Sequence, residues 1–222
     1  MVTREWLVTN GLGGYASGTV AGVITRRYHG MLIAALAAPL GRIVMLSHVA
    51  EEVRLPDNRR IEIGGRERIG DAPDAHGTGY LVEFRLDAGL PVWRYDVDGI
   101  VIEKRLFMPH MQNTVHAALR ARRRARSVAE LTLRPSVNFR VQEAPLSEPL
   151  GWPYELRVGR RTCGDLLWRA ARCRASVEGV GRRVDADGER SADSRACCIR
   201  SRRAAATTRA AISGVRDAST SN

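Results

Sequence analysis

The sequence predicts an all-β fold, an antiparallel β-sandwich, in residues 1–158 of the 222-residue chain. Short segments with alternating apolar and polar residues recur along this part, which is the period of a strand with one buried face. Turn-forming residues separate these segments, and no convincing amphipathic helix lies between them. Strands joined by short turns pair in antiparallel order, and one apolar face per strand favours two packed sheets.

A glycine-rich stretch without any carboxylate opens the domain, VTNGLGGYASGTVAGVITRRYHGMLIAAL at residues 8–36. Gly11 and Gly13, with the alanine three residues later, fit the dinucleotide fingerprint G-x-G-x-x-G/A. That site also needs a helix after the glycines and an acidic residue about 20 positions on. The residues that follow are a poor helix, and no Asp or Glu occurs between Glu5 and Glu51. The sequence therefore argues against dinucleotide binding.

A phosphate-binding Walker A loop is excluded as well, because that loop ends in Gly-Lys-Ser/Thr and the only lysine of the chain is Lys104. Judged by chemistry alone, the stretch is a glycine-rich turn between strands, where glycine supplies positive φ angles and close backbone approach. A strand is expected after it, at residues 30–35.

Two hairpins are predicted from their turns. Asp98-Gly99 is a dipeptide that a two-residue type I′ turn prefers, because both positions need φ > 0. The first strand of this hairpin buries Trp93, Tyr95 and Val97, and the second buries Ile100, Ile102 and Leu106, interrupted by Lys104. In the other hairpin Pro56-Asp57-Asn58 forms the turn. Its inward residues are Val53, Leu55, Ile61 and Ile63.

Further strands are expected at residues 42–46, 80–86, 114–120 and 129–133. The basic run between the last two, Arg120–Arg126, is expected to be a loop.

Charge and cysteine divide the chain near residue 159. The net charge is +11, but residues 1–158 hold 21 basic against 17 acidic residues, whereas residues 159–222 hold 14 against 7. All four cysteines fall in this second part, where no histidine occurs and Cys197 and Cys198 are adjacent. That spacing fits neither a zinc site nor a redox C-x-x-C motif. No metal site and no cofactor are expected.

The second part, residues 159–222, is rich in Arg, Ala, Ser and Gly and has no sustained period. Such a composition predicts a disordered tail. Three origins stay open: a frameshift near residue 159 in GC-rich DNA, a genuine disordered tail, and an arginine-rich RNA-binding arm. The near absence of lysine, one against 34 arginines, favours the frameshift.

Neither a secretory signal nor an 18-residue apolar run occurs in the sequence. We therefore expect a cytoplasmic protein that does not contact a membrane.

Two motifs at a fixed offset are far more specific than a lone G-x-G-x-x-G: NGLGGYASGT, beginning at Asn10, and TRRYHG, beginning at Thr25. With the looser segments KRLFMPHMQNTV and LTLRPSVNFR, they resemble the amino-terminal domain of bacterial and archaeal glycogen debranching enzymes of the amylo-α-1,6-glucosidase type, over about residues 4–158. Met31 departs mildly from that family, and Arg120–Arg126 is unusually basic for it.

The resemblance implies a supersandwich-like β-sandwich followed by an (α/α)6-barrel glycosidase domain, which these 222 residues do not contain. It also implies that the family's catalytic carboxyl pair belongs to the barrel. Here Glu51 and Glu52 are adjacent and point to opposite faces of a strand, and Glu83 and Glu103 are expected to face solvent. No catalytic residue is assigned, and the chain alone is expected to be inactive.

The first functional hypothesis is a non-catalytic domain that docks against the glycosidase domain and contributes to α-glucan binding. Asn10 to Gly14 are expected to form a tight turn, with Arg26 and Arg27 near the start of a buried strand. Because the arginines have no local acid, we expect their partners on the missing barrel; the alternative is that they are solvated. The candidate contact residues are Asn10, Gly11, Gly13, Gly14, Arg26, Arg27, Tyr28 and His29.

The aromatic residues offer a further route to glucan. Tyr28, Trp6, Trp93 and Trp152 are able to stack on sugar rings, although aromatics in a sandwich are more often core. The second functional hypothesis is a basic nucleic-acid-binding module, based on RARRRARS and the arginine-rich tail. It is the weaker one, because no stacking aromatics are interleaved with the arginines.

Overall fold

The structure is a computed structural model. It describes residues 1–65, 76–123, 130–145, 155–157, 162–168, 173–179 and 195–201. Strands make up most of these ranges, and their one helix is the short 3-10 helix η1 (His76–Tyr80). No helix within them has the length and apolar character needed to cross a bilayer.

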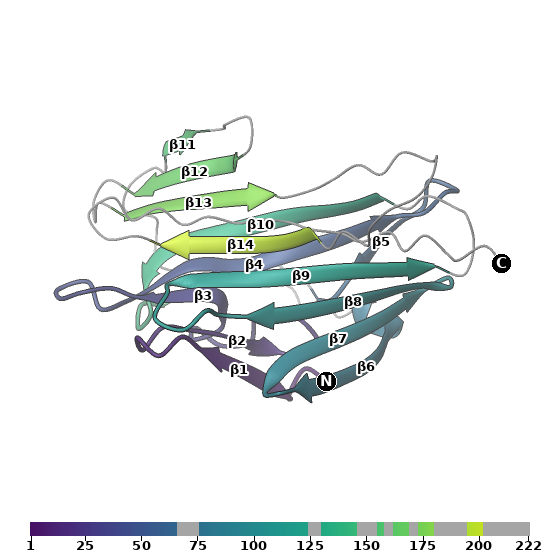
Figure 1. The fold of residues 1–222 in the computed structure, drawn as a ribbon, viewed down its shortest axis with the longest axis horizontal. Helices are drawn as coiled ribbons and strands as arrows, with labels where there is room; N and C mark the ends of the chain where they lie inside the picture. The colour runs from purple at the N-terminus through teal and green to yellow at the C-terminus, as the bar shows by residue number, and fades with distance from the viewer. Residues whose placement is uncertain are drawn as a thin grey trace.

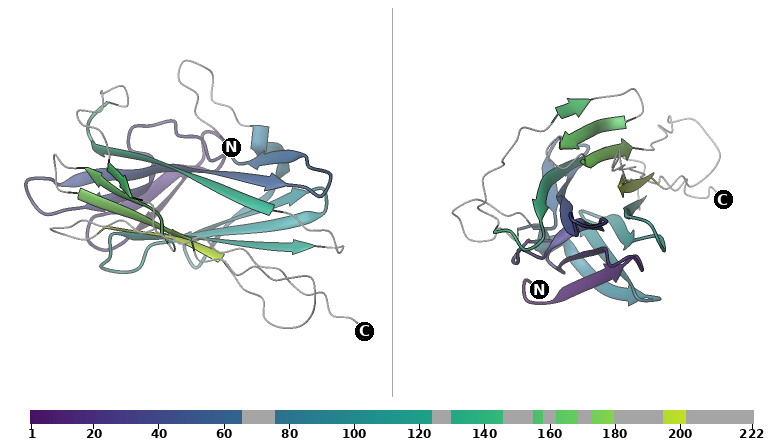
Figure 2. Two further views of the ribbon diagram at one scale, coloured as in Figure 1. Left: turned by 90° about the horizontal axis from the view of Figure 1, so that it is seen from above. Right: turned by 90° about the vertical axis from the view of Figure 1, so that its left-hand side faces the viewer.

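Two antiparallel sheets pack face to face (Figure 1, Figure 2). In the described ranges the first sheet has the strand order β1-β2-β3-β4-β10, and β5 also pairs with β4. Its strands are β1 (Glu5–Thr9), β2 (Tyr15–Thr19), β3 (Gly30–Ala35), β4 (Arg42–Arg54), β5 (Arg60–Ile63) and β10 (Glu130–Val141). The predicted strand at residues 30–35 is confirmed.

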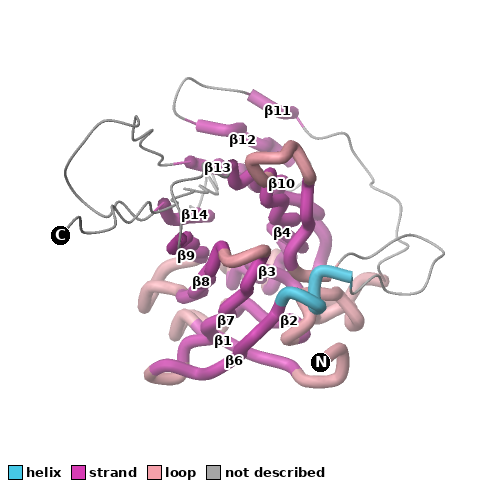
Figure 3. Tube along the Cα trace, turned by 90° about the vertical axis from the view of Figure 1, so that its right-hand side faces the viewer, coloured by secondary structure: helices cyan, strands magenta, loops and turns pink. Residues whose placement is uncertain are grey.

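The second sheet has the strand order β11-β12-β13-β14-β9-β8-β7-β6 within the same ranges. Its strands are β6 (Leu81–Asp87), β7 (Leu90–Val97), β8 (Ile100–Phe107), β9 (Thr114–Arg123), β11 (Glu155–Arg157), β12 (Thr162–Trp168), β13 (Cys173–Gly179) and β14 (Arg195–Ser201). Figure 3 shows the two sheets from one end. The predicted all-β antiparallel fold is confirmed.

The hairpin of β7 and β8 turns at Asp98-Gly99, as predicted. The two turn residues have φ angles of 52° and 79°, both positive as a type I′ turn requires. The Gly99 N–H donates to the Asp96 carboxylate at 2.9 Å. The inward residues of this hairpin are buried as predicted: Trp93, Tyr95, Val97, Ile100, Ile102 and Leu106.

The second predicted hairpin joins β4 and β5, which pair from Glu51 with Ile63 to Arg54 with Arg60. Its four predicted inward residues, Val53, Leu55, Ile61 and Ile63, are buried. β4 is longer than expected, because it continues from the predicted 42–46 strand into the hairpin. At Ser47 the register with β10 shifts, and this bulge changes which side chains face the core.

β9 is also longer than expected. It continues through Arg123, opposite Ile100 of β8, so the first part of the basic run Arg120–Arg126 is strand rather than loop. Residues 124–129 lie outside the described residues.

Trp6 and Trp93 meet in the core between the sheets, with ring centroids 5.3 Å apart in an edge-to-face arrangement. Their indole N–H groups donate to the carbonyls of Thr19 and Val20. Both tryptophans are therefore core residues, while Trp152 lies outside the described residues.

Three stretches of the predicted tail, residues 159–222, are strands in the structure: β12, β13 and β14. β14 pairs with β9, from Arg195 opposite Leu119 to Arg200 opposite Thr114. These residues form strands because they pair with the edge of an existing sheet, which their composition does not indicate. The other residues of the tail lie outside the described ranges, and for them the predicted disorder stays a prediction.

Candidate functional site

The chain makes a tight turn directly after β1. The Asn10 carboxamide oxygen accepts from the N–H groups of Leu12 and Gly14, both at 3.0 Å, and the Asn10 N–H donates to the Gly14 carbonyl at 3.1 Å. Gly11 and Gly13 have φ angles of 79° and 91°. The predicted turn from Asn10 to Gly14 is confirmed, and Gly13 also accepts a hydrogen bond from Arg42 at 2.7 Å.

Asn113 links this turn to the second sheet. Asn10 Nδ2 donates to the Gln112 carbonyl at 2.9 Å and to Asn113 Oδ1 at 3.0 Å. Asn113 in turn bonds both backbone groups of Ala35, at the end of β3. Asn113 is not among the predicted site residues, although it lies near the end of the segment KRLFMPHMQNTV.

Two glycines of the turn leave no room for a side chain. A Cβ on Gly14 would lie 2.7 Å from Asn10 Nδ2 and 2.9 Å from both Asn113 Oδ1 and the Ile33 carbonyl. A Cβ on Gly11 would lie 2.6 Å from the His110 ring. These glycines therefore permit the close packing of the turn on its neighbours.

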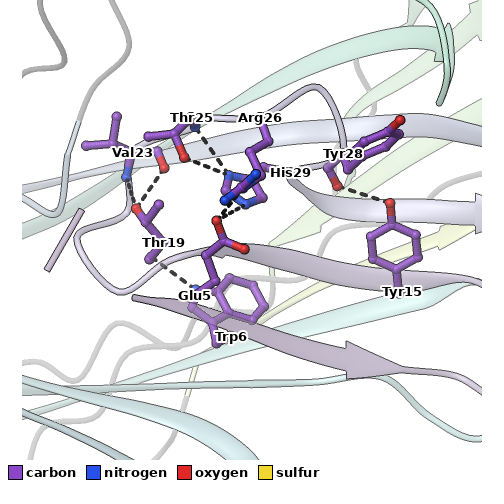
Figure 4. A network of polar contacts seen from close by, with 9 residues as sticks. All are labelled: Glu5, Trp6, Tyr15, Thr19, Val23, Thr25, Arg26, Tyr28 and His29. Atoms are coloured by element: carbon purple, nitrogen blue, oxygen red, sulfur yellow. Dashed lines mark hydrogen bonds and ion pairs between the residues drawn. The ribbon is translucent and has the colours of Figure 1, made fainter. Parts of the chain in front are cut away.

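Arg26 and His29 share a carboxylate, Glu5, as Figure 4 shows. Arg26 Nε lies 2.5 Å from Glu5 Oε1, and His29 Nε2 lies 3.5 Å from the same oxygen. The hydrogen bond from Arg26 lowers the pKa of the Glu5 carboxyl. Both Arg26 and Glu5 are partly exposed, so this pair contributes little to folding stability by itself.

The His29 ring is buried, with 2% of its surface exposed. Nδ1 accepts from the Thr25 N–H at 3.2 Å, which places the proton of the neutral ring on Nε2, facing Glu5. Burial lowers the pKa of His29, against the opposing effect of the Glu5 carboxylate. The lowered pKa favours the neutral ring of His29, which lies directly before β3.

Arg27, Tyr28 and Glu143 form a second, exposed cluster. Arg27 donates to the Glu143 carbonyl at 3.2 Å and to the Tyr28 hydroxyl at 2.6 Å, and its guanidinium lies 4.8 Å from the Tyr28 ring centroid. The Tyr28 hydroxyl donates to Glu143 Oε2 at 3.2 Å. Buried Arg140 donates to the Arg27 carbonyl and, at 3.0 Å, to the Ala144 carbonyl.

Arg26 and Arg27 have acidic partners within the chain, whereas the sequence led us to expect those partners on the missing barrel. Glu5 on β1 and Glu143 after β10 supply them, because the fold places distant parts of the sequence beside the arginines. The eight predicted residues thus form three contact groups. The first is the turn from Asn10 to Gly14, the second is Arg26 and His29 beside Glu5, and the third is Arg27 and Tyr28 beside Glu143.

The four carboxylates considered for catalysis each lie beside a cation. Glu51 and Glu52 do point to opposite faces of β4, as predicted. Glu51 is buried against Lys104, and Glu52 lies 2.8 Å from Arg134. Glu83 and Glu103 lie 3.2 Å and 3.0 Å from Arg85 and Arg105, respectively. Among the described residues, no group of three or more His, Cys, Asp and Glu side chains is placed to hold a metal ion.

The family model described as "Glycogen debranching enzyme N terminal" matches residues 4–161. The chain belongs to this family. No curated protein and no solved structure shows significant similarity to it.

The match extends over nearly the whole glycogen debranching enzyme N-terminal domain predicted from the sequence, and it contains the three contact groups described above. It ends two residues after Gly159, where the composition changes, and one residue before β12 begins. Strands β12, β13 and β14 therefore lie outside the part of the chain that the family describes.

Proposed function

We propose that this domain is a non-catalytic part of a glycogen debranching enzyme that docks on the glycosidase domain and positions it for α-glucan breakdown. The family match over residues 4–161 carries the proposal. Glycoside hydrolysis needs one protonated and one ionised carboxyl group roughly 5 to 9.5 Å apart. Glu51, Glu52, Glu83 and Glu103 instead lie beside cations, which supports a role other than catalysis. We also propose a cytoplasmic location, as expected from the sequence.

The docking surface in this proposal is the cluster of Arg27, Tyr28 and Glu143. The Arg27 and Glu143 side chains are 48% and 69% exposed, yet hydrogen bonds hold both in place. Charged groups that are ordered before binding lose less conformational entropy when a partner arrives. The partner chemistry that fits is a surface offering a carboxylate to Arg27 and a basic group to Glu143.

The test uses a full-length family member, in which the residue matching Arg27 is changed to alanine. We expect weaker association of the two domains and slower glucose release from a branched limit dextrin, since a hydrogen bond to a charged group contributes about 1.5 to 3 kcal/mol. The matched control is alanine at the position of Arg94, an exposed arginine on β7. Unchanged association and turnover in a folded Arg27 variant would show that this cluster is not the docking surface.

A further inference from the structure

β6 forms one edge of the second sheet. Among the described strands it pairs with β7 alone, and it lies at the lower border of the molecule in Figure 1 and Figure 3. Half of the backbone N–H and C=O groups of an edge strand point away from its sheet and are able to pair with another strand. We propose that β6 pairs antiparallel with β6 of a second copy of this chain, so that the second sheets of the two copies join into one.

The large apolar side chains of β6 are incompletely buried. Val82 and Leu86 are 63% and 61% exposed. Phe84, midway between them, packs on Trp93 with ring centroids 5.3 Å apart, yet it is only partly buried. Three such side chains on an edge with unpaired backbone groups form a template for another strand.

The sequence of β6 is complementary to itself about Phe84. In an antiparallel pair centred on Phe84, Val82 of each copy lies opposite Leu86 of the other, and Glu83 lies opposite Arg85. Opposite charges at directly opposed positions stabilise a strand pair, and so do opposed apolar side chains. Centring the pair on Arg85 instead would place two arginines opposite each other, and Glu83 opposite an aspartate. The charges of β6 therefore select a second copy as the partner and fix its register.

The pairing also matches the two faces of the sheet. Phe84 points to the inner face, so its neighbours Glu83 and Arg85 point to the outer face. There Glu83 lies 3.9 Å from Arg94 on β7, and Arg85 lies 3.2 Å from Glu103 on β8. A second copy would continue this outer row of alternating charges, and the two Phe84 rings would meet on the apolar inner face.

The edge of the first sheet does not show this complementarity. β1 is the edge strand there in the described strand order, and it exposes Leu7. A pair centred on Leu7 would place Glu5 opposite Thr9, and Glu5 already pairs with Arg26 in its own chain. β6 is therefore the better edge for joining two copies.

Sedimentation equilibrium of the 222-residue chain over a range of concentrations tests the proposal. We expect a monomer–dimer equilibrium with a Kd of about 1 to 100 μM, as for a small interface. No larger species should form, because a two-fold pair uses the same edge in both copies. A chain that stays monomeric up to about 1 mM would overturn the proposal, and so would growth beyond a dimer.

Two charge reversals test the register. Glu83→Arg and Arg85→Glu each place like charges opposite one another, so we expect either variant alone to dimerise at least about tenfold more weakly than wild type. In an equal mixture, with one variant carrying a fluorescent label, the two should form a heterodimer, because positions 83 and 85 then again oppose unlike charges. Arg94→Glu is the control, since it reverses a charge one strand away from the edge and should leave the dimer intact. A mixture of folded variants that does not recover dimerisation would overturn the pairing.

A third variant changes only an exposed apolar side chain and should therefore fold. Leu86→Lys is expected to weaken the dimer by about tenfold. Leu7→Lys on β1 is its matched control and should dimerise like wild type, as should Arg27→Ala, because the docking cluster contains no residue of β6. Wild-type dimerisation of Leu86→Lys, or equal weakening by Leu7→Lys, would show that β6 is not the dimer contact.

Discussion

Asn10 is 1% exposed, and each polar group of its side chain has a hydrogen-bond partner. It closes its own turn through Oδ1 and holds the Gln112–Asn113 loop through Nδ2. A buried amide satisfied in this way fixes one geometry, because any other arrangement leaves a donor or acceptor unpaired. Asn10 therefore joins the glycine turn to the second sheet.

Gly14→Ala tests how tightly this junction is packed. The added methyl group would lie 2.7 Å from Asn10 Nδ2 and 2.9 Å from a backbone carbonyl. We expect the free energy of unfolding to fall by about 1 to 3 kcal/mol, measured by urea denaturation. Gly79→Ala is the control, since a Cβ there meets nothing within 4 Å and should change stability by no more than about 0.5 kcal/mol. Equal effects of the two changes would contradict the packing described.

His29 gives the domain a pH-dependent stability. Its pKa is lowered in the folded state, so the unfolded chain binds more protons as pH falls through the ordinary histidine range. Stability contributed by neutral His29 is complete above about pH 6.5 and is lost progressively below it. Glu5, whose pKa is also lowered, would add a loss only at more acidic pH.

We expect His29→Gln to flatten the dependence of the unfolding free energy between about pH 7.5 and about pH 5.5. Urea denaturation of both proteins at several pH values measures this pH dependence. The contributions of the other histidines are the same in both proteins and cancel in the difference. A slope as steep in the variant as in wild type would assign the pH dependence to another group.

At the scale of elements, the two sheets are joined by a buried ion pair as well as by apolar packing. Lys104 on β8 pairs with Glu51 on β4, and its ammonium lies 5.3 Å from the Trp93 ring centroid. Burial raises the pKa of Glu51, while Lys104 opposes that shift. In the sequence, Lys104 interrupts the apolar face of β8. The structure explains this interruption, because Lys104 pairs there with the buried carboxylate of Glu51.

Lys104→Met should destabilise the fold by about 3 to 5 kcal/mol, because it leaves the Glu51 carboxylate buried without its cation. The double variant Lys104→Met with Glu51→Leu should recover most of that loss, since neither charge remains. Thermal and urea unfolding of the two single variants and the double variant measure the coupling. Additive losses would show that the two side chains do not depend on each other.

Both hairpins were predictable because their turns are local: Asp98-Gly99 and residues 56–58 carry the conformational preference themselves. β2 was not predicted, since YASGT has no clear period and becomes a strand by pairing with β1 and β3 on either side. The length of β4 was also not predicted. The bulge at Ser47 shifts the alternation of buried and exposed residues, so one continuous strand has the sequence pattern of two separate strands.

The contacts of the candidate site were less predictable than its residues. The motif residues from Asn10 to His29 identify the right region, but their partners lie far along the chain: Asn113 is 103 positions from Asn10, and Glu143 is 115 positions from Tyr28. Only the pairing of distant strands brings such residues together.

At the scale of the whole molecule, a family domain of residues 4–161 provides the sandwich, and the docking role is a proposal for its surface. We expect the 222-residue chain to release no detectable glucose from a branched limit dextrin, because its candidate carboxylates are paired with cations. A glucose assay on repurified protein measures this. Activity that persists through repurification and disappears when one carboxylate is replaced would reveal a missed catalytic site.

Docking is tested most directly by titrating this chain with the separately produced glycosidase domain of a family member, followed by calorimetry. We expect a saturable complex that weakens by about tenfold or more in Arg27→Ala and Glu143→Ala and is unchanged in Arg94→Ala. Each variant must unfold at the wild-type temperature for the comparison to count. A folded chain that forms no complex, or a complex that is indifferent to Arg27 and Glu143, would contradict it.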